Sequence, residues 1–230
     1  MKPDPDQTGP QPLKTSLTLD GTWLNFDLGE TMKVLSWAIN RPGLVDASRI
    51  LWRQINPGTL TKSLNVEAWL DAELQARGAQ DAIAFLTSRT VSNRVEQQVQ
   101  RPDFQLHCVA TVGLGNAERV GARINHGQTT GGTINIAVAT NLGLSKQARL
   151  EAMSIVVQAR TTAILEQQVQ LPTGYATGTG TDCVAIASPD GDTLYAGMHT
   201  EFGEVLGRAV LSCVSEGARK WRAQKAAGHL

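Results

Sequence analysis

The sequence predicts a single α/β domain of the α+β kind, with a mixed β-sheet and flanking helices. Strand-like alternation of apolar and polar residues dominates the first half of the chain, and the two longest helical patterns lie in the second half. Strands that come first in hairpin order and later alternate with helices disfavour a purely parallel sheet. A length of 230 residues suits one domain, and no internal repeat or linker divides it.

The strands are predicted from period-two alternation and from short apolar runs. Residues 16–28 fit a hairpin whose turn lies at Asp20 and Gly21. Residues 33–39 are expected to form a third strand, whereas residues 45–54 fit either a short helix or a strand. Further strands are expected at residues 81–89, 104–116, 132–141 and 183–189, and residues 190–197 should turn back into another strand.

Three helices are predicted from capping residues and helical periodicity. The first covers residues 65–78, with Asn65 as its N-cap and Gly78 as its stop. The second covers residues 145–168 and is capped by Ser145. The third runs from residue 200 to about residue 226. The buried face of the second helix is expected to carry Leu150, Met153, Val157 and Ile164.

Composition excludes several classes of protein. Lys and Arg together number 21, as do Asp and Glu, and this balance disfavours a nucleic-acid-binding protein. The three cysteines have no short spacing, so neither a disulfide framework nor a zinc site is expected, and a reducing cytoplasm is the expected location. No apolar run reaches the length of about 18 residues that a membrane-spanning helix needs. Residues 1–15 are predicted to be a disordered tail without the apolar core of a signal peptide, and residues 16–230 to be the folded domain.

Common catalytic and nucleotide-binding motifs are absent from the sequence. There is no G-x-x-x-x-G-K-[ST] phosphate loop, and the glycine-containing stretches at Gly113 and Gly178 lack the third glycine of a dinucleotide fingerprint. H-E-x-x-H and G-x-S-x-G are also missing. The sequence therefore argues against nucleotide-binding, zinc-protease and serine-hydrolase functions of these kinds.

Four polar clusters instead follow or precede predicted strands, where loops often carry function. The third, "YATGTGTDC" at residues 175–183, has two interpretations. It is either a tight loop in which Asp182 caps a turn, or a cradle whose backbone N–H groups hold an oxyanion while Asp182 acts as general base. The other three clusters are "VGLGNA" at residues 112–117, "GGTINI" at residues 131–136 and "HTEFGE" at residues 199–204.

The "HTEFGE" cluster at residues 199–204 also has two interpretations. Thr200 can cap the last helix with Glu201 at its positive end, or His199 can serve as an acid or base near neutral pH. His199, Glu201 and Glu204 could also hold a metal, but no metal-ligand spacing supports this, so no metal is expected here. Cys183 alternates with Asp182 along a strand and should point to the opposite face, which disfavours a cysteine nucleophile.

Taken together, "VGLGNA", "GTINI", "ATGTGTD" and "HTEFGE" resemble, in order and spacing, the adenosylcobinamide amidohydrolase family. "VLSWAI" and "FLTSR" are similar to that family as well, so the resemblance runs from about Val34 to about Val210. It implies an enzyme that cleaves the aminopropanol amide of adenosylcobinamide to adenosylcobyric acid and 1-amino-2-propanol. That reaction salvages or remodels cobalamin precursors. The corrinoid is then the substrate, no further cofactor is expected, and a homo-oligomer is left open.

For such a reaction we hypothesise roles for individual residues. Asp182 or Glu201 would activate water, N–H groups of residues 177–181 would hold the oxyanion, and His199 would protonate the departing amine. Direct attack by a threonine hydroxyl stays open, with Thr181 as the candidate. Trp37 or Trp52 could pack against the corrin ring. The expected substrate-binding residues are Thr177, Gly178, Thr179, Gly180, Asn135, Thr133, Asn116, Gly115 and Glu204.

Two other functions compete with this one. The same loops would suit a corrinoid-binding or carrier protein that performs no chemistry. They would also suit an amidohydrolase that acts on a different amide. Following the fate of adenosylcobinamide by mass spectrometry separates the three functions.

Overall fold

The computed structural model describes residues 11–56, 58–61, 63–124 and 131–228. Its helices are α1 (Val66–Ala76), α2 (Lys146–Glu166) and α3 (Glu201–Ala226), with a 3₁₀ turn η1 (Val91–Asn93). The main strands are β1 (Ser16–Asp20), β2 (Trp23–Ser36), β3 (Gly43–Gln54), β4 (Ile83–Thr87), β5 (Val95–Gln100), β6 (Gln105–Val112), β8 (Ile134–Thr140) and β12 (Cys183–Ser188). Two short pairs join β7 (Ala117–Glu118) to β11 (Gly178–Thr179), and β9 (Gln170–Leu171) to β10 (Gly174–Tyr175).

The main strands form one eight-stranded mixed sheet in the order β4-β3-β2-β12-β8-β6-β5, with β1 paired to β2. This confirms the predicted single α+β domain with a mixed sheet. Within it, β12 is parallel to β8, and β4 is parallel to β3, while the other pairs along the sheet are antiparallel. Among the described residues, no helix is both long and apolar enough to cross a bilayer.

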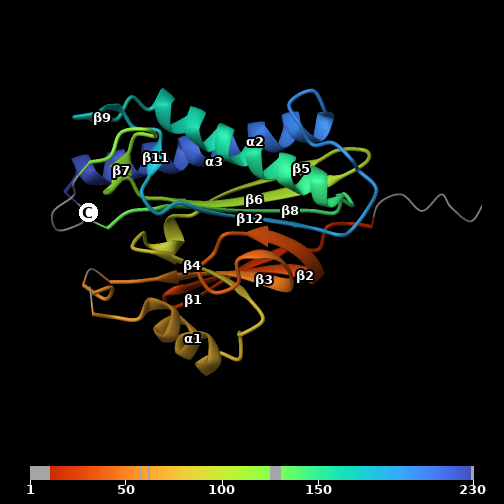
Figure 1. Cartoon of the computed structure of the whole chain (residues 1–230), viewed down its shortest axis with the longest axis horizontal. Coiled ribbons are helices and arrows are strands. Elements are labelled where there is room, and N and C mark those ends of the chain that lie inside the picture. Colours follow the sequence, from red (N-terminus) through yellow and green to blue (C-terminus); the bar gives the residue numbers. More distant parts are fainter. Residues whose placement is uncertain (1–10, 57, 62, 125–130, 229–230) are drawn as a thin grey trace, which may run out of the picture.

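The sheet folds over on itself, so the molecule has four layers (Figure 1). Helices α2 and α3 cover β12, β8, β6 and β5, whereas β1 to β4 curl beneath these strands and α1 lies outermost. The bend lies in β2, whose pairing with β3 shifts register between Asp27 and Met32. A hydrophobic core fills the space between the two halves of the sheet, and a second core lies under α2 and α3.

Several predicted elements differ from those in the structure. Residues 33–39 are not a third strand, because the hairpin strand continues through the bend to Ser36. Residues 45–54 are a strand rather than a helix. The polar edge strand β5 was not predicted, since "VEQQVQ" has little apolar alternation. The strand expected at residues 190–197 is absent; that segment makes only isolated bridges from Leu144 to Asp190 and Thr193.

The N-terminal segment contributes to the fold from residue 11 onward. Leu13 N donates to Gln105 Oε1 at 2.6 Å, and Asn141 Nδ2 donates to the carbonyl oxygen of Gln11 at 2.7 Å. Residues 11–15, assigned to the tail by composition, therefore lie against the start of β6 and the residue that follows β8. The rest of the expected tail, residues 1–10, lies outside the described residues.

The caps of all three helices are as predicted, but the buried face of α2 is not. Asn65, Ser145 and Thr200 each accept a backbone hydrogen bond as N-cap. Leu150, expected to be buried, is 63% exposed, and of the four predicted residues only Ile164 is buried. Small side chains let α2 approach the sheet and α3 closely, so its buried residues are Ala148, Arg149, Ala152, Ile155, Val156, Ala159, Ala163 and Ile164.

We expect Arg149→Ala to lower the free energy of unfolding by about 2–4 kcal/mol. Arg149 is buried, and its guanidinium donates to Ser188 Oγ at 2.9 Å and to the Pro189 carbonyl oxygen at 2.6 Å, while pairing with Asp190. Its loss would leave a cavity and unpaired acceptors at the end of β12. Urea denaturation measures the effect. Arg208→Ala, which removes an exposed ion pair with Glu204, should change stability by less than about 0.5 kcal/mol.

His107 should make stability depend on pH. It is buried between the halves of the sheet, with Nδ1 2.8 Å from Thr15 Oγ1 and Nε2 3.2 Å from Glu96. Burial lowers the pKa of His107, and the neighbouring Glu96 only partly offsets this. As pH falls below about 6.5, the unfolded chain takes up a proton at this histidine before the folded chain does, so stability should decrease. Urea midpoints between pH 7 and pH 5 should fall less steeply for His107→Gln; an unchanged slope would contradict this account.

Candidate active site

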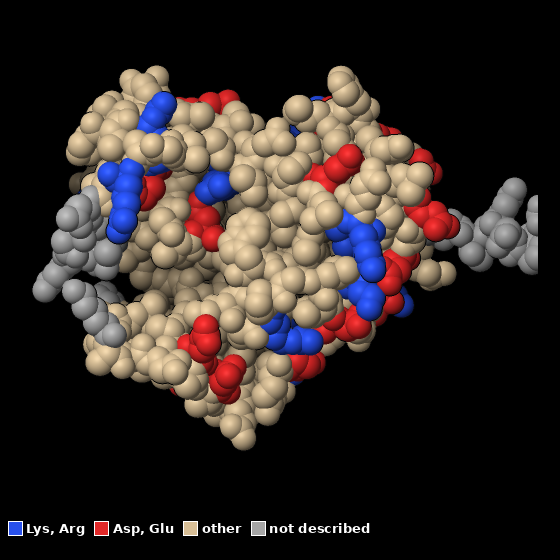
Figure 2. Space-filling model, viewed as in Figure 1, with Lys and Arg blue, Asp and Glu red and all other residues tan. Residues whose placement is uncertain are grey.

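A pocket of about 670 Å³ opens between the two halves of the sheet. The face seen in Figure 2 is hollowed between its upper and lower parts, at the end where β7 and β11 lie in Figure 1. This volume lies in the range of pockets that bind small molecules. One wall is largely apolar and comprises Trp37, Ile39, Ile55, Leu60, Val66, Ala84, Phe85 and Leu86. Thr87 and Ser88 follow Leu86 at the end of β4, and the remaining lining residues come from the segments beside β6, β8 and β12: Asn116, Gly131, Gly132, Thr133, Asn135, Gly180, Thr181, Asp182 and Cys183.

Sheet topology explains why three of the four polar clusters meet at this pocket. Parallel pairing of β12 with β8 places Cys183, the first residue of β12, beside Asn135, the second residue of β8. Antiparallel pairing of β6 with β8 places the end of β6 at Val112 beside Ile134. The loops before β12, before β8 and after β6 therefore lie at one edge of the sheet. They bring Asn116, Thr133, Asn135, Gly180, Thr181 and Asp182 to the same pocket.

Glycine is required where two of these loops touch. A Cβ atom built on Gly132 would lie 2.5 Å from the backbone nitrogen of Gly115 and 3.1 Å from its Cα. The clash is between backbones, so no side-chain rotation relieves it. The segment "GGTINI" is therefore glycine-rich because the chain after β6 passes directly against it.

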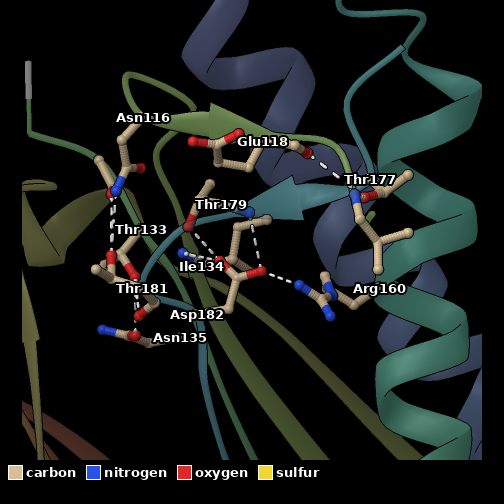
Figure 3. A network of polar contacts seen from close by, with 12 residues as sticks. Asn116, Glu118, Thr133, Ile134, Asn135, Arg160, Thr177, Thr179, Thr181 and Asp182 are labelled. Atoms are coloured by element: carbon tan, nitrogen blue, oxygen red, sulfur yellow. Dashed lines mark hydrogen bonds and ion pairs between the residues drawn. The ribbon is translucent and has the colours of Figure 1, made fainter. Parts of the chain in front are cut away.

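Asp182 is the centre of a network of polar contacts (Figure 3). Its carboxylate accepts from Ile134 N at 3.1 Å, from Thr179 N at 3.0 Å, from the Thr179 hydroxyl and from the Arg160 guanidinium. A carboxylate has about four lone-pair positions, and these four donors account for all of them. Asp182 therefore ties its own loop to β8 and to α2.

Arg160 was not identified as a site residue from the sequence. It extends from α2, and its side chain and that of Asp182 are 15% and 8% exposed. Burial lowers the pKa of Arg160. The only sequence signal is a cation on the inner side of α2, which it shares with Arg149, and the partner of Arg160 lies 22 residues further along the chain.

The threonines of this loop mostly hold the loop itself. Thr177 donates its N–H to the Glu118 carbonyl oxygen at 2.8 Å and accepts from Val120 N at 2.7 Å. Gly180 N donates to the Asn116 carbonyl oxygen at 3.3 Å, and Thr179 N donates to Asp182. The expected cradle of N–H groups is thus already engaged at these three positions.

Asn116 and Thr181 form the polar corner of the pocket. Asn116 Nδ2 donates to Thr181 Oγ1 at 3.2 Å, and Thr133 Oγ1 donates to the Thr181 carbonyl oxygen at 2.7 Å. The other amide atom, Asn116 Oδ1, is buried and has no hydrogen-bond partner among the described residues. Asn135 instead spans the two halves of the sheet, with Nδ2 2.8 Å from the Leu86 carbonyl oxygen. An acceptor without a partner at this corner suits an N–H group of a ligand.

The family model for adenosylcobinamide amidohydrolase matches residues 13–226. The chain belongs to the adenosylcobinamide amidohydrolase family. The match covers nearly all of the folded domain and confirms the resemblance seen in the loop motifs. The name of the family is that of an amide hydrolase.

Two other proteins are similar to this chain, and neither adds to the assignment of its family. An uncharacterized protein, MJ1613 of Methanocaldococcus jannaschii, is 36% identical over 89 residues. That match spans 37% of this chain and 35% of the relative, so the chain covers only about a third of it. The crystal structure of the PH0078 protein from Pyrococcus horikoshii OT3 is 12% identical, with a TM-score of 0.40 over 90% of this chain and 82% of that one.

The fourth polar cluster, "HTEFGE" at residues 199–204, does not reach the pocket. Asp182 precedes β12 and His199 follows it, and a strand of six residues spans roughly 20 Å. Glu201 lies 3.5 Å from Arg101 beside the β5–β6 turn, and Glu204 pairs with Arg208 on the surface of α3. In Figure 1 the loop leading into α3 lies at the right and β11 at the left. The expectation that His199, Glu201 and Glu204 share a pocket with Asp182 is therefore wrong, and Thr200 serves as the N-cap of α3.

Cys183 lines the pocket but is a poor nucleophile. Burial raises the pKa of its thiol to about 12, only partly offset by the Ser36 hydroxyl and the Val184 backbone. At neutral pH the side chain is therefore an uncharged thiol, in line with the interpretation that it is not catalytic. No group of three metal-binding side chains occurs within the described part of the chain.

Only one of the two candidate ring-packing tryptophans is accessible. Trp52 is fully buried in the core, with its ring 5.1 Å from that of Phe85. Trp37 is 43% exposed at the pocket, and its indole N–H donates to the Asp182 carbonyl oxygen at 2.7 Å. The loop that carries Asp182 therefore also fixes the position of the Trp37 ring.

Proposed function

We propose that the protein hydrolyses the aminopropanol amide of adenosylcobinamide, releasing adenosylcobyric acid and 1-amino-2-propanol for salvage of cobalamin precursors. The observation that carries the proposal is the pocket itself, where an apolar wall faces a corner of amide and hydroxyl groups. Membership of the adenosylcobinamide amidohydrolase family supports the same activity. The reaction consumes water and requires no further cofactor.

The apolar wall suits the edge of a corrin ring. Trp37, Ile39 and Leu60 line the pocket and are 43%, 42% and 41% exposed, so their side chains are available to a ligand. Large aromatic surfaces contribute strongly to binding when they are covered, and the hydrogen bond from Trp37 to the Asp182 loop lowers the entropy cost of covering this one.

The polar corner suits the scissile amide. Asn116 Oδ1 would accept the amide N–H, which places the carbonyl carbon beside the Thr181 hydroxyl. That hydroxyl orients the attacking water, or attacks directly to give an acyl-enzyme. When water attacks, its oxygen bonds to the carbonyl carbon, the C–N bond breaks, and a proton from that water leaves with the amine. When Thr181 attacks, its hydroxyl proton leaves with the amine, and a water molecule then cleaves the ester to release the acid and restore the hydroxyl. Asp182, with its four donors, holds Thr181 in place rather than taking the proton.

One observation favours a carrier as second candidate. Asp182 is the only carboxylate among the described residues that line the pocket, and its lone pairs are engaged. A pocket built for binding alone would have this character. The two functions differ in one result, the appearance of products.

The test is incubation with adenosylcobinamide and detection of both products by mass spectrometry. We expect Thr181→Val to slow release about tenfold to hundredfold, because it removes the hydroxyl but keeps the shape. His199→Ala should stay within about threefold of wild type, since His199 lies at the far end of β12. Thr162→Val, on the exposed side of α2, is the matched control.

Each contrary result has a distinct meaning. Bound but unchanged adenosylcobinamide would identify a carrier. Failure of cobinamide either to bind or to compete would indicate a different amide substrate. Loss of turnover in a folded His199→Ala protein would contradict the location of the site, and trapping of an acyl-enzyme would favour direct attack by Thr181.

A further inference from the structure

Ser88 is a residue of the pocket that the proposed mechanism does not yet use. It directly follows β4, is half-buried, and lines the pocket. Its hydroxyl makes no hydrogen bond to another of the described residues. A serine hydroxyl can donate one hydrogen bond, so this group is available to a ligand in the pocket.

The side of the pocket formed by residues 37–88 has few other polar groups. Of its lining residues only Trp37, Thr87 and Ser88 have a polar side chain. The Trp37 indole N–H already donates to the Asp182 carbonyl oxygen. Thr87 is 1% exposed, and its hydroxyl already accepts a backbone N–H. Ser88 is therefore the side chain on this side of the pocket that can donate a hydrogen bond to a ligand.

Two glycines place the Ser88 hydroxyl close to the polar corner formed by Asn116 and Thr181. A Cβ atom built on Gly131 would lie 2.8 Å from Ser88 Oγ, so the hydroxyl packs directly against this glycine. A Cβ atom on Gly132 would lie 3.2 Å from Asn116 N, and the Gly132 carbonyl oxygen accepts from Thr181 Oγ1 at 3.5 Å. Ser88 and the polar corner thus contact consecutive residues of one segment.

We propose that the Ser88 hydroxyl is the donor that stabilises the oxyanion formed when the amide is cleaved. This inference rests on the proposed amide hydrolysis and adds a catalytic residue to it. In a trans amide the N–H and the C=O point in opposite directions. An amide whose N–H is accepted by Asn116 Oδ1 therefore turns its carbonyl oxygen away from Asn116 and across the pocket, toward the side that carries Ser88.

The reaction needs such a donor because negative charge develops on the carbonyl oxygen. Attack by water or by the Thr181 hydroxyl forms a C–O bond and moves the π electrons of the carbonyl group onto its oxygen. The charge persists until the C=O bond re-forms, the C–N bond breaks and the amine leaves with a proton. The N–H groups of Thr177, Thr179 and Gly180, which were expected to hold this charge, are engaged within their own loop. The Ser88 hydroxyl keeps its proton throughout.

Steady-state kinetics of Ser88→Ala with adenosylcobinamide tests this assignment. The kcat value should fall about hundredfold while KM stays within about threefold, because the donor interacts more strongly with the oxyanion than with the neutral carbonyl group. Ser88→Cys keeps a weak S–H donor and should be slowed less. Ser92→Ala is the matched control, because Ser92 lies exposed in η1, does not line the pocket, and should keep the wild-type kcat.

A double-mutant cycle with Gly131→Ala tests the position of the hydroxyl. The new methyl group would lie 2.8 Å from Ser88 Oγ and 2.9 Å from Ser88 Cβ, so it must displace the serine side chain, and Gly131→Ala should slow turnover at least about tenfold. Ser88→Gly removes both of these atoms. Adding Gly131→Ala to Ser88→Gly should therefore slow turnover by less than about twofold more. Fully additive losses would contradict the placement of Ser88.

Each contrary result overturns either this assignment alone or the reaction as well. If wild-type protein releases products and Ser88→Ala matches its kcat, whether or not KM rises, Ser88 is not the oxyanion donor and the proposed hydrolysis stands. An adenosylcobyric acid ester located on Ser88 by peptide mass spectrometry would identify a nucleophile and also overturn the donor role. If wild-type protein releases no products, the proposed function and the role of Ser88 fail together. Thermal unfolding at the wild-type temperature confirms that Ser88→Ala is folded.

Discussion

Asp182→Asn is expected to lower the free energy of unfolding by about 3–5 kcal/mol, the cost of breaking a buried ion pair by removing one partner. The substitution leaves the largely buried guanidinium of Arg160 without its counter-ion. It also places an amide among donors from Ile134, Thr179 and Arg160, where only an acceptor fits. Turnover should fall at least about hundredfold, because the loop that carries Thr181 would shift.

Stability and turnover, measured together, distinguish a structural role of Asp182 in holding its loop from a role as catalytic base. Urea denaturation should show the loss for Asp182→Asn but less than about 1 kcal/mol for Asp46→Asn, whose acid pairs with Lys33 at the surface and is 58% exposed. Adding Arg160→Gln to Asp182→Asn should recover part of the stability, since no buried charge is then left alone. A fully stable Asp182→Asn protein without activity would instead identify Asp182 as the base.

Gly132→Ala is expected to lower stability by about 1–3 kcal/mol and turnover by about hundredfold. The new methyl group would lie 2.5 Å from the backbone nitrogen of Gly115, so the chain after β6 must move and the pocket wall must move with it. Thermal unfolding and the product assay measure the two effects.

Gly207→Ala is the control for this substitution. Gly207 lies in α3 away from the pocket, and the nearest contact of a new methyl group there is Ile155 Cγ2 at 3.4 Å, an ordinary van der Waals distance. Alanine also has the higher helix propensity, so this protein should be as stable as wild type or more so. Gly132→Ala turning over at the wild-type rate would show that the pocket wall tolerates the displacement.

Local sequence patterns predicted most elements of the fold and three parts of the site. Caps at Asn65, Ser145 and Thr200, together with apolar alternation, placed the helices and most strands, because these signals act within a few residues. Polar loops at the ends of predicted strands identified Asn116, Thr133 and Asp182 as neighbours of the pocket.

The remaining features depend on contacts between distant segments. Nothing local to "HTEFGE" shows that β12 carries it to the opposite end of the sheet from Asp182. Pairing of Arg160 with Asp182 requires α2 to lie against the loop before β12, which follows from packing of small residues rather than from a motif. The fold-over of the sheet at β2, which creates the apolar wall of the pocket, arises from a register shift that the alternation does not reveal.

A crystal structure with adenosylcobyric acid bound tests the account most directly. We predict that the corrin edge packs on Trp37, and that the side chain from which the aminopropanol has been cleaved enters between Asn116 and Thr181, with its carboxylate beside the Thr181 hydroxyl. A corrin ring bound instead beside His199 and Glu201, at the other end of β12, would contradict it.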